Sequence, residues 1–319
     1  KYGCRSCTNV VKTAPGPDRV IEKGIMGKGF LAQVVADRFQ NHMPYYRLEK
    51  KYASEGLDLN RSVLQRSMAR VAELLEPIWR RLHTEVMSSP AIHTDDTTVT
   101  IVNNGSGTSR KGRVWVYLDL KGRHYYDYTE SRNRDGPMKI LEGYEGYIHA
   151  DAFPGYDQIF THTGATEVAC WAHARRYFVN AESTDPELAK GAIDRIRKLF
   201  RVETSAKDLD SAARHRMRNE VAKPILDELN AWLEVTRTKV LPKSPMGTAI
   251  GYALNQWDAL TRYLDDGRLR IDNNAAERAM RPIAVGRKNW LFYQSDTGGR
   301  TAAIIMSLLE SAKAVGVDP

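Results

Sequence analysis

The sequence predicts a mixed α/β (α+β) protein whose core is interrupted by a large helical insertion. Residues 91–103, 113–120 and 123–130 are rich in β-branched and aromatic side chains and alternate in polarity, as half-buried strands do. Residues 134–183 alternate helical spacing with short apolar runs. Residues 185–265 place their apolar side chains only at helical spacing. An antiparallel meander, an alternation of helix and strand, and an all-helical stretch therefore follow one another along the chain.

The order of the core elements is that of a ribonuclease-H-like fold. A Gly/Ser-rich loop at 104–112 and a tight turn at Lys121-Gly122 join the first three strands. The later elements are a helix around 134–142, a short strand at 147–150, a helix near 155–162, a strand at 166–170 and a helix from Trp171.

The region before the first strand, residues 27–88, is predicted to be helical. One amphipathic pattern contains Phe30, a second begins at Tyr45 after Pro44, and Asn60 caps a third. Two helices joined by a Gly-containing turn resemble a helix-turn-helix, which makes this region a candidate for DNA binding. Any small helical bundle gives the same pattern.

We divide the chain into five segments. They are a partial zinc-ribbon remnant with a linker (1–26), the helical region (27–88), the first part of the core (89–183), the all-helical insertion (184–266) and the second part of the core (267–319). In the last segment we expect a short helix closed by Pro282, a loop through Gly286, Gly298 and Gly299, and a helix from Thr301 to about Ala314.

The composition favours a polyanionic partner. The chain has 319 residues, a formal net charge of +8 and a pI near 9.3, and nucleic acid is the first candidate. No apolar run is long enough to span a membrane. Three cysteines do not make a disulfide framework, and reduced thiols fit a cytoplasmic, nucleoid-associated protein.

Cys4 and Cys7 form a C-x-x-C pair, which is half of a four-ligand zinc site. Because the chain starts at Lys1 without Met and stops inside a helical pattern, we expect it to be part of a longer protein that holds the other half. Two free thiols on a frayed end are the alternative, since two ligands hold zinc poorly.

Acidic residues at three places form the candidate reactive site. Asp95 and Asp96 lie in the first strand, where successive side chains point to opposite faces, and the alternation does not choose between them. Asp151 ends a short strand, where open α/β sheets bind ligands, and Glu277 is the third acid. Three carboxylates can hold two Mg²⁺ ions, with Mn²⁺ able to substitute, for phosphodiester chemistry. Each acid taken alone is more often a turn or cap residue.

The stretch from Asp272 to Phe292 surrounds Glu277 with cations. Asp272 and its neighbours can cap a helix of about three turns, with Glu277 in the first turn. The side chains that suit contact with a DNA backbone or base are Arg278, Arg281, Arg287, Lys288 and Trp290. The alternative is a solvated surface helix with buried aromatic residues.

Six motifs run in order through nearly the whole chain. They are HTDDTTV (93–99), HADAFPGY (149–156), CWAHARRYF (170–178), DNNAAERAMRP (272–282), GRKNWLF (286–292) and GGRTAAIIMSLLESAK (298–313). Together they resemble transposases of the insertion-sequence 66 family, bacterial enzymes of the DDE type. The resemblance implies that Asp95, Asp151 and Glu277 are the catalytic, metal-binding triad. Where the family tends to read D-E-T and D-G-Y, this chain has Asp-Asp-Thr and Asp-Ala-Phe, and the acids themselves are present.

The segment that begins at Cys170 follows the second aspartate. C-x-x-H here lacks a second ligand pair, which argues against zinc. Comparable segments in other DDE transposases imply that His173 supports the active site, near the scissile phosphate or behind Asp151, with Arg175 and Arg176 on the DNA backbone. A core histidine is an equal alternative.

The resemblance implies hydrolysis at transposon ends and attack of the freed 3′-hydroxyl on target DNA. It also implies a homo-oligomer assembled on DNA and accessory proteins encoded by the same element. Two rival functions stay open: a two-metal nuclease without strand transfer, and a non-catalytic DNA-binding relic that ignores Mg²⁺.

Overall fold

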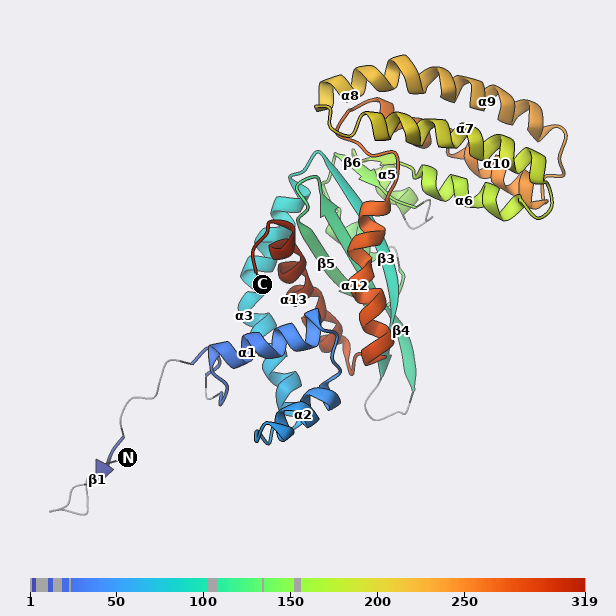
Figure 1. Ribbon diagram of the computed structural model, residues 1–319. Coiled ribbons are helices and arrows are strands. Elements are labelled where there is room, and N and C mark those ends of the chain that lie inside the picture. The colour runs from blue at the N-terminus through green and yellow to red at the C-terminus, as the bar shows by residue number, and fades with distance from the viewer. Residues whose placement is uncertain are drawn as a thin grey trace.

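The computed structural model describes residues 2–3, 11–13, 19–22, 24–102, 108–133, 135–151 and 156–318. Cys4 and Cys7, the predicted half of a zinc site, lie outside these residues. Figure 1 shows the N-terminal and C-terminal helices gathered around a sheet, with a separate group of helices at one end of that sheet. In the described part of the chain, no helix is long and apolar enough to cross a membrane.

Five strands form the central sheet. They are β3 (Ala91–Val102), β4 (Ser109–Asp119), β5 (His124–Thr129), β6 (Tyr147–His149) and β7 (Thr166–Val168), in the spatial order β5-β4-β3-β6-β7. The first three pair antiparallel, and β6 and β7 run parallel to β3. This order and these directions agree with the predicted ribonuclease-H-like core. A separate two-stranded pairing joins β1 (Tyr2–Gly3) and β2 (Val11–Lys12).

Two short helices connect strands of the core: α4 (Asp135–Ile140) and α5 (Asp157–His162). Helix α6 (Trp171–Ala181) follows the last strand. The turn between β4 and β5 falls at Lys121-Gly122 as predicted, and Gly122 adopts a positive φ of 84° there.

The N-terminal region is helical and packs directly on the sheet. Its elements are α1 (Lys28–Val35), a π-helical segment (Ala36–Gln40), α2 (Tyr45–Ser54) and α3 (Arg61–Met87). Asn60 caps α3 as predicted, because its side-chain oxygen accepts a hydrogen bond from the N–H of Ser62 at 2.8 Å. Trp79 of α3 donates to the carbonyl of Tyr126 in β5 at 3.1 Å. The apolar side chains of these helices belong to the same core as those of the meander.

Residues 184–266 contain helices and connecting turns only. The helices are α7 (Pro186–Ser205), α8 (Ser211–Met217), a π-helical segment (Arg218–Ala222), α9 (Lys223–Arg237), α10 (Pro245–Asn255), α11 (Trp257–Thr261) and a 3₁₀ turn (Arg262–Leu264). They surround a second hydrophobic core that includes Ile196, Leu229 and Ile250. Arg262 donates to the carbonyl of Glu167 at 2.8 Å, which attaches this group of helices to the edge strand β7.

Helix α12 (Asn274–Trp290) is longer than predicted, because Pro282 does not end it and Gly286 lies inside it. Proline removes one backbone hydrogen bond. The helix nevertheless buries Ile283 and Trp290 while it packs along β3 and β4, and this packing outweighs the local propensity. Gly286 allows a close approach, since a Cβ there would lie 2.6 Å from Nε1 of Trp290.

Helix α13 (Asp296–Ala314) begins before the predicted Thr301 and takes Gly298 and Gly299 into its first turn. Ser295 caps it by accepting a hydrogen bond from the N–H of Gly298. Two serines farther along α13 cover the edge of β5: Ser307 and Ser311 accept hydrogen bonds from the N–H groups of Tyr126 and His124 at 2.8 and 2.9 Å. These bonds satisfy backbone groups on the unpaired side of this edge strand.

Candidate active site

The register of two parallel strands brings two aspartates together. His93 of β3 lies opposite His149 of β6, and their ring centroids are 4.1 Å apart. Asp95 and Asp151 each follow two residues later, so each lies on the same face as the histidine before it. Neighbouring strands lie about 4.8 Å apart. The two carboxylates are therefore neighbours, and the charge of Asp151 raises the pKa of Asp95.

Asn273, which immediately precedes α12, positions the third acid. Its Oδ1 accepts a hydrogen bond from Nδ1 of His93 at 3.0 Å, and its Nδ2 donates to the carbonyl of Thr94 at 2.8 Å. Both contacts are buried and tie the start of α12 to β3. Glu277 lies in the first turn of this helix, and its charge also raises the pKa of Asp95.

Asp95 carries a partly buried carboxylate on which other acids act. Burial, followed by the negative charges of Asp151, Asp96 and Glu277, raises its pKa to about 7, although a hydrogen bond from the N–H of Asp96 acts in the opposite direction. Burial also raises the pKa of Asp151, and the charge of His173 opposes that shift. Among the described residues no Lys or Arg forms an ion pair with Asp95. A bound cation would relieve this repulsion.

Asp96 is an ion-paired structural residue. Its carboxylate is 3% exposed and lies 2.5 Å from Nη1 of Arg113 and 3.0 Å from Nη2 of Arg132. Two arginines therefore neutralise Asp96, while no arginine that the structure describes is paired with Asp95. This difference distinguishes two neighbouring acids that the strand alternation left equivalent.

Helix α6 brings His173 to the same place. Nε2 of His173 and Nη2 of Arg176 each lie 3.4 Å from Oε1 of Glu277. Nδ1 of His173 has no hydrogen-bond partner among the residues that the structure describes. Cys170, at the start of α6, is buried, and its Sγ accepts a hydrogen bond from the N–H of Asn273 at 3.2 Å. His173 therefore borders the carboxylates, and Cys170 links α6 to α12.

Comparison with known proteins places this chain in a family. Residues 23–301 match the family model described as "Transposase IS66 family". The chain belongs to this family. It is 30% identical to "Uncharacterized protein y4hP" and 32% identical to "Uncharacterized protein y4qI", both of Sinorhizobium fredii, over all of its own length. It spans 62% of the length of each of these curated relatives.

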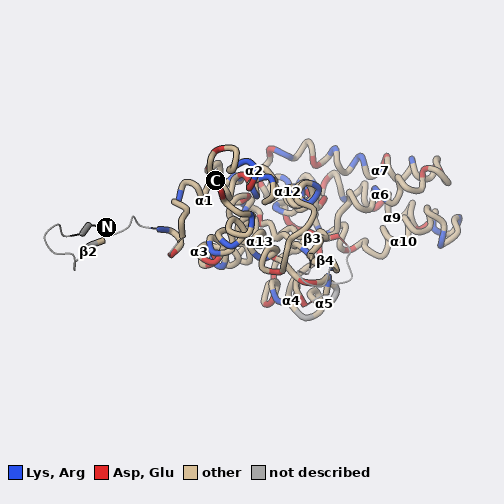
Figure 2. The backbone as a smooth tube through the Cα atoms, turned by 90° about the horizontal axis from the view of Figure 1, so that it is seen from below, with Lys and Arg blue, Asp and Glu red and all other residues tan. Residues whose placement is uncertain are grey.

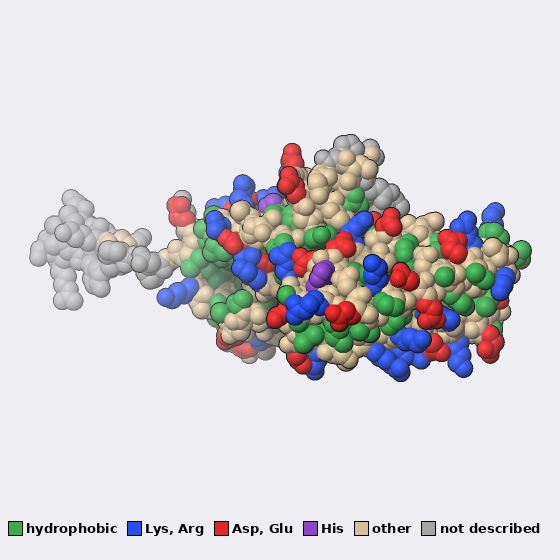
Figure 3. All heavy atoms as spheres, turned by 90° about the horizontal axis from the view of Figure 1, so that it is seen from above, with side chains coloured by type: hydrophobic (Ala, Val, Ile, Leu, Met, Phe, Trp, Pro, Cys, Tyr) green, Lys and Arg blue, Asp and Glu red, His purple; other side chains and the backbone are tan. Residues whose placement is uncertain are grey.

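In this member of the transposase IS66 family, exposed basic side chains lie on α6 and along α12. Figure 2 shows Lys and Arg segments along α12 and near α2. On the face shown in Figure 3, a histidine lies near the middle with acidic and basic side chains around it. The predicted DNA-contacting residues that are exposed are Arg175, Arg176, Arg278, Arg281 and Lys288.

Two other predicted DNA contacts face the protein interior. Arg287 donates from Nη1 to Oγ1 of Thr97 at 2.8 Å and to the carbonyl of Thr98 at 2.7 Å, which attaches α12 to β3. Trp290 is buried, and its ring stacks on Tyr293 with centroids 4.4 Å apart. Their placement argues against the predicted contacts of Arg287 and Trp290 with DNA and gives both residues a structural role.

Sequence reasoning missed the stacked histidines beneath the aspartates. Burial lowers the pKa of His93 to about 4 and that of His149 well below its ordinary value, so both rings are neutral at pH 7. The pattern His-x-Asp occurs twice, at 93–95 and at 149–151. This repeat could have indicated that the two strands lie side by side in register.

The carboxylate oxygens of this site are ligands of the type that a hard divalent cation prefers. Within the described residues, no group of three or more His, Cys, Asp or Glu side chains lies close enough together to hold one ion. Mg²⁺, however, is commonly bound by one or two carboxylates, with water and substrate phosphate as the other ligands. Asp95 with Asp151, or Asp95 with Glu277, is a pair of this kind.

Proposed function

We propose that this chain catalyses DNA transposition through Asp95, Asp151 and Glu277, which would hold Mg²⁺, with Mn²⁺ able to substitute. One observation carries the proposal. The negative charges of Asp151 and Glu277 act on Asp95, and in the described residues no Lys or Arg is paired with it. Membership of a transposase family supports DNA as the substrate. The same membership is the basis for proposing a homo-oligomer on DNA and accessory proteins from the same element.

The proposed reaction has two phosphoryl-transfer steps. The oxygen of a water attacks the phosphorus at a transposon end, and the bond from that phosphorus to the 3′-oxygen breaks, which leaves a 3′-hydroxyl and a 5′-phosphate. The 3′-hydroxyl then attacks a phosphorus of the target, where one P–O bond forms as another breaks. When bound, Mg²⁺ would favour deprotonation of the attacking group and stabilise the leaving oxygen.

The residues around Glu277 hold it at the edge of the site. His173 and Arg176 lie on the same oxygen of its carboxylate, each at 3.4 Å. These contacts join the partly exposed Glu277 side chain to α6. We assign His173 as a positioning residue for Glu277. The exposed Arg175 and Arg278 would contact the DNA backbone.

The test is a cleavage and strand-transfer assay on DNA that carries the terminal sequences of the element, with Mg²⁺ or with EDTA. We expect Asp95→Asn and Asp151→Asn to abolish both products and to leave DNA binding intact. Asp208→Asn, which changes an exposed residue of the insertion, is the matched control. Cleavage without joining would identify a nuclease, and binding without cleavage in Mg²⁺ would identify a relic.

A further inference from the structure

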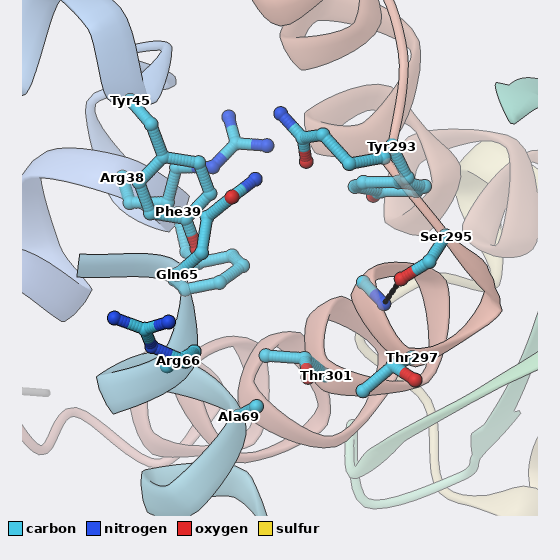
Figure 4. Close-up of a pocket in the computed structure, with 12 residues that line it drawn as sticks. Arg38, Phe39, Tyr45, Gln65, Arg66, Ala69, Tyr293, Ser295, Thr297 and Thr301 are labelled. Atoms are coloured by element: carbon cyan, nitrogen blue, oxygen red, sulfur yellow. Dashed lines mark hydrogen bonds between the residues drawn. The ribbon is translucent and has the colours of Figure 1, made fainter. Parts of the chain in front are cut away.

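Near the C-terminal end of α12, two adjoining cavities of about 220 and 460 Å³ form a cleft. Four residues line both cavities: Arg38, Tyr45, Gln65 and Gln294. We name it the Arg38 cleft. One wall comes from the π-helical segment, α2 and α3, and the other from residues 289–301. Figure 4 shows Arg38 and Gln65 facing Tyr293 and Ser295 across the cavity.

Arg38 is a buried cation that forms no ion pair with an acid in the described part of the chain. It is 2% exposed, its Nη1 donates to the carbonyl of Met43 at 3.3 Å, and its Nε has no partner among the described residues. Its guanidinium lies 4.7 Å from the centroid of the Tyr45 ring. The buried Arg218, also in a π-helical segment, differs because it forms two hydrogen bonds to the carboxylate of Glu203, at 2.8 and 2.7 Å. A buried charge is costly unless it is paired. Arg38 therefore favours an anion from outside the chain.

The rest of the lining has the same sign of charge. Arg61 and Arg66 stand exposed at the cleft, and no Asp or Glu is among the described residues that line it. Neither Arg61 nor Arg66 forms a side-chain ion pair within the described chain. Three arginines in one cleft match a phosphate group.

Aromatic and amide side chains accompany the arginines. Tyr46 and Phe292 line the larger cavity and are partly exposed, so their rings can accept a stacked base. Gln65, Asn289 and Gln294 supply amides of the kind that bond to base edges. The cleft therefore offers arginines for a phosphate, aromatic rings for a stacked base and amides for a base edge. We propose that the Arg38 cleft holds one unstacked nucleotide of a DNA strand.

This inference rests on the proposed function and adds a position to it. Glu277 lies near the start of α12 and Trp290 ends it, which at the helical rise of 1.5 Å per residue separates them by about 20 Å. DNA that follows α12 would cover this distance in about six base pairs, at 3.4 Å each. A base within a duplex is enclosed by its neighbours, so the nucleotide in the cleft must be single-stranded or extruded.

The test measures binding in EDTA, where no metal contributes. The probes are a single strand, a duplex with one unpaired 2-aminopurine, and the fully paired duplex. We expect Phe292→Ala and Arg66→Ala to weaken binding of the first two probes by about tenfold and to remove the change in 2-aminopurine fluorescence. Fully paired duplex should bind as before. Arg201→Ala, an exposed arginine of the insertion, is the matched control.

Two results would overturn the proposal. One is unchanged binding of the unpaired probes by both cleft variants, and the other is an equal loss for the paired duplex. Because Arg38 is buried, its replacement would also disturb folding, so the test uses Phe292 and Arg66.

Asp95→Asn should bind all three probes like the wild type. If the wild type does not cleave DNA in Mg²⁺ but the cleft variants lose the unpaired probes, the cleft stands and the proposed catalysis fails. If cleavage depends on Asp95 but the cleft variants bind normally, the proposed catalysis stands and the proposal for the cleft fails.

Discussion

Nδ2 of Asn273 donates a hydrogen bond to the carbonyl oxygen of Thr94 at 2.8 Å, and the two residues are 179 positions apart in the sequence. Thr94 immediately precedes Asp95, and Asn273 immediately precedes the helix that carries Glu277. One buried amide therefore fixes two carboxylates of the candidate active site relative to each other.

Asn273→Ala should lower the free energy of unfolding by about 2 to 4 kcal/mol, because it leaves the carbonyl of Thr94 and Nδ1 of His93 buried without partners. Urea denaturation measures this, with the exposed Asn180→Ala as the control. If the two variants have the same free energy of unfolding, the hydrogen bonds of Asn273 do not stabilise the fold. We also expect weaker Mn²⁺ binding by Asn273→Ala in calorimetry, since the pair Asp95 and Glu277 would no longer be held together.

Asp95→Asn should stabilise the protein in alkaline but not in acidic solution. The pKa of Asp95 is raised to about 7 in the folded state, so the folded state binds more protons than the unfolded state between about pH 4 and pH 7. Stability therefore falls as pH rises through this window, and the asparagine variant removes that loss. Melting temperatures in EDTA should agree at about pH 4 and favour the variant at about pH 8.

Burial also raises the pKa of Asp127, to about 6, so the pH dependence of the wild type includes both groups. The difference between wild type and Asp95→Asn isolates Asp95. A variant that is no more stable than the wild type in alkali would show that Asp95 is not destabilised there. Mn²⁺ should raise the melting temperature of the wild type in alkali and leave that of the variant unchanged.

Arg218→Met should destabilise the protein by about 3 to 5 kcal/mol, because it leaves the carboxylate of Glu203 without its partner in the insertion. It also removes donors to the carbonyls of Tyr263 and Leu269, which lie in the segment that leads to α12. Thermal unfolding of Arg218→Met against the exposed Arg216→Met measures the effect. Equal melting temperatures would contradict this account.

Leu291→Gly should stabilise the protein by about 1 kcal/mol, because Leu291 occupies a strained backbone conformation. It has φ 65° and ψ −43°, and the N–H of Phe292 bonds to the carbonyl of Trp290 across it at 2.7 Å, which makes a γ-turn. Its side chain is 63% exposed, so the glycine variant loses little apolar burial. Calorimetric melting checks this, and Leu291→Val, which keeps the strain, should not be stabilised.

Local signals predicted much of the fold. The cap at Asn60, the turn at Gly122 and the three strands of the meander follow from side chains that act within a few residues. The interpretation of Pro282 as a helix end was wrong, because a contact between distant parts of the chain overrides this local signal. The apolar face of α12 packs on β3 and β4, and no local pattern contains that contact.

Charge alone did not reveal which basic residues remain accessible. Arg287 has the same charge as Arg278 and lies in the same helix, yet it faces Thr97 and Thr98 of β3, whereas Arg278 is exposed. The direction of a helical side chain depends on how the helix sits on its sheet, which spacing within one helix does not specify.

The sequence by itself determined the order of strands and helices and the basic character of the chain, because these depend on residue type and on local spacing. It left Asp95 and Asp96 equivalent. Tertiary structure decided that Asp95 and not Asp96 is the uncompensated acid, since the arginines that neutralise Asp96 come from β4 and from the segment after β5. It also formed the Arg38 cleft, whose lining comes from residues 38–69, from Val102 and from residues 289–301. Ion pairs and cleft linings of this kind bring together residues that lie far apart in the sequence. Packing in the folded state decides which of these residues come into contact.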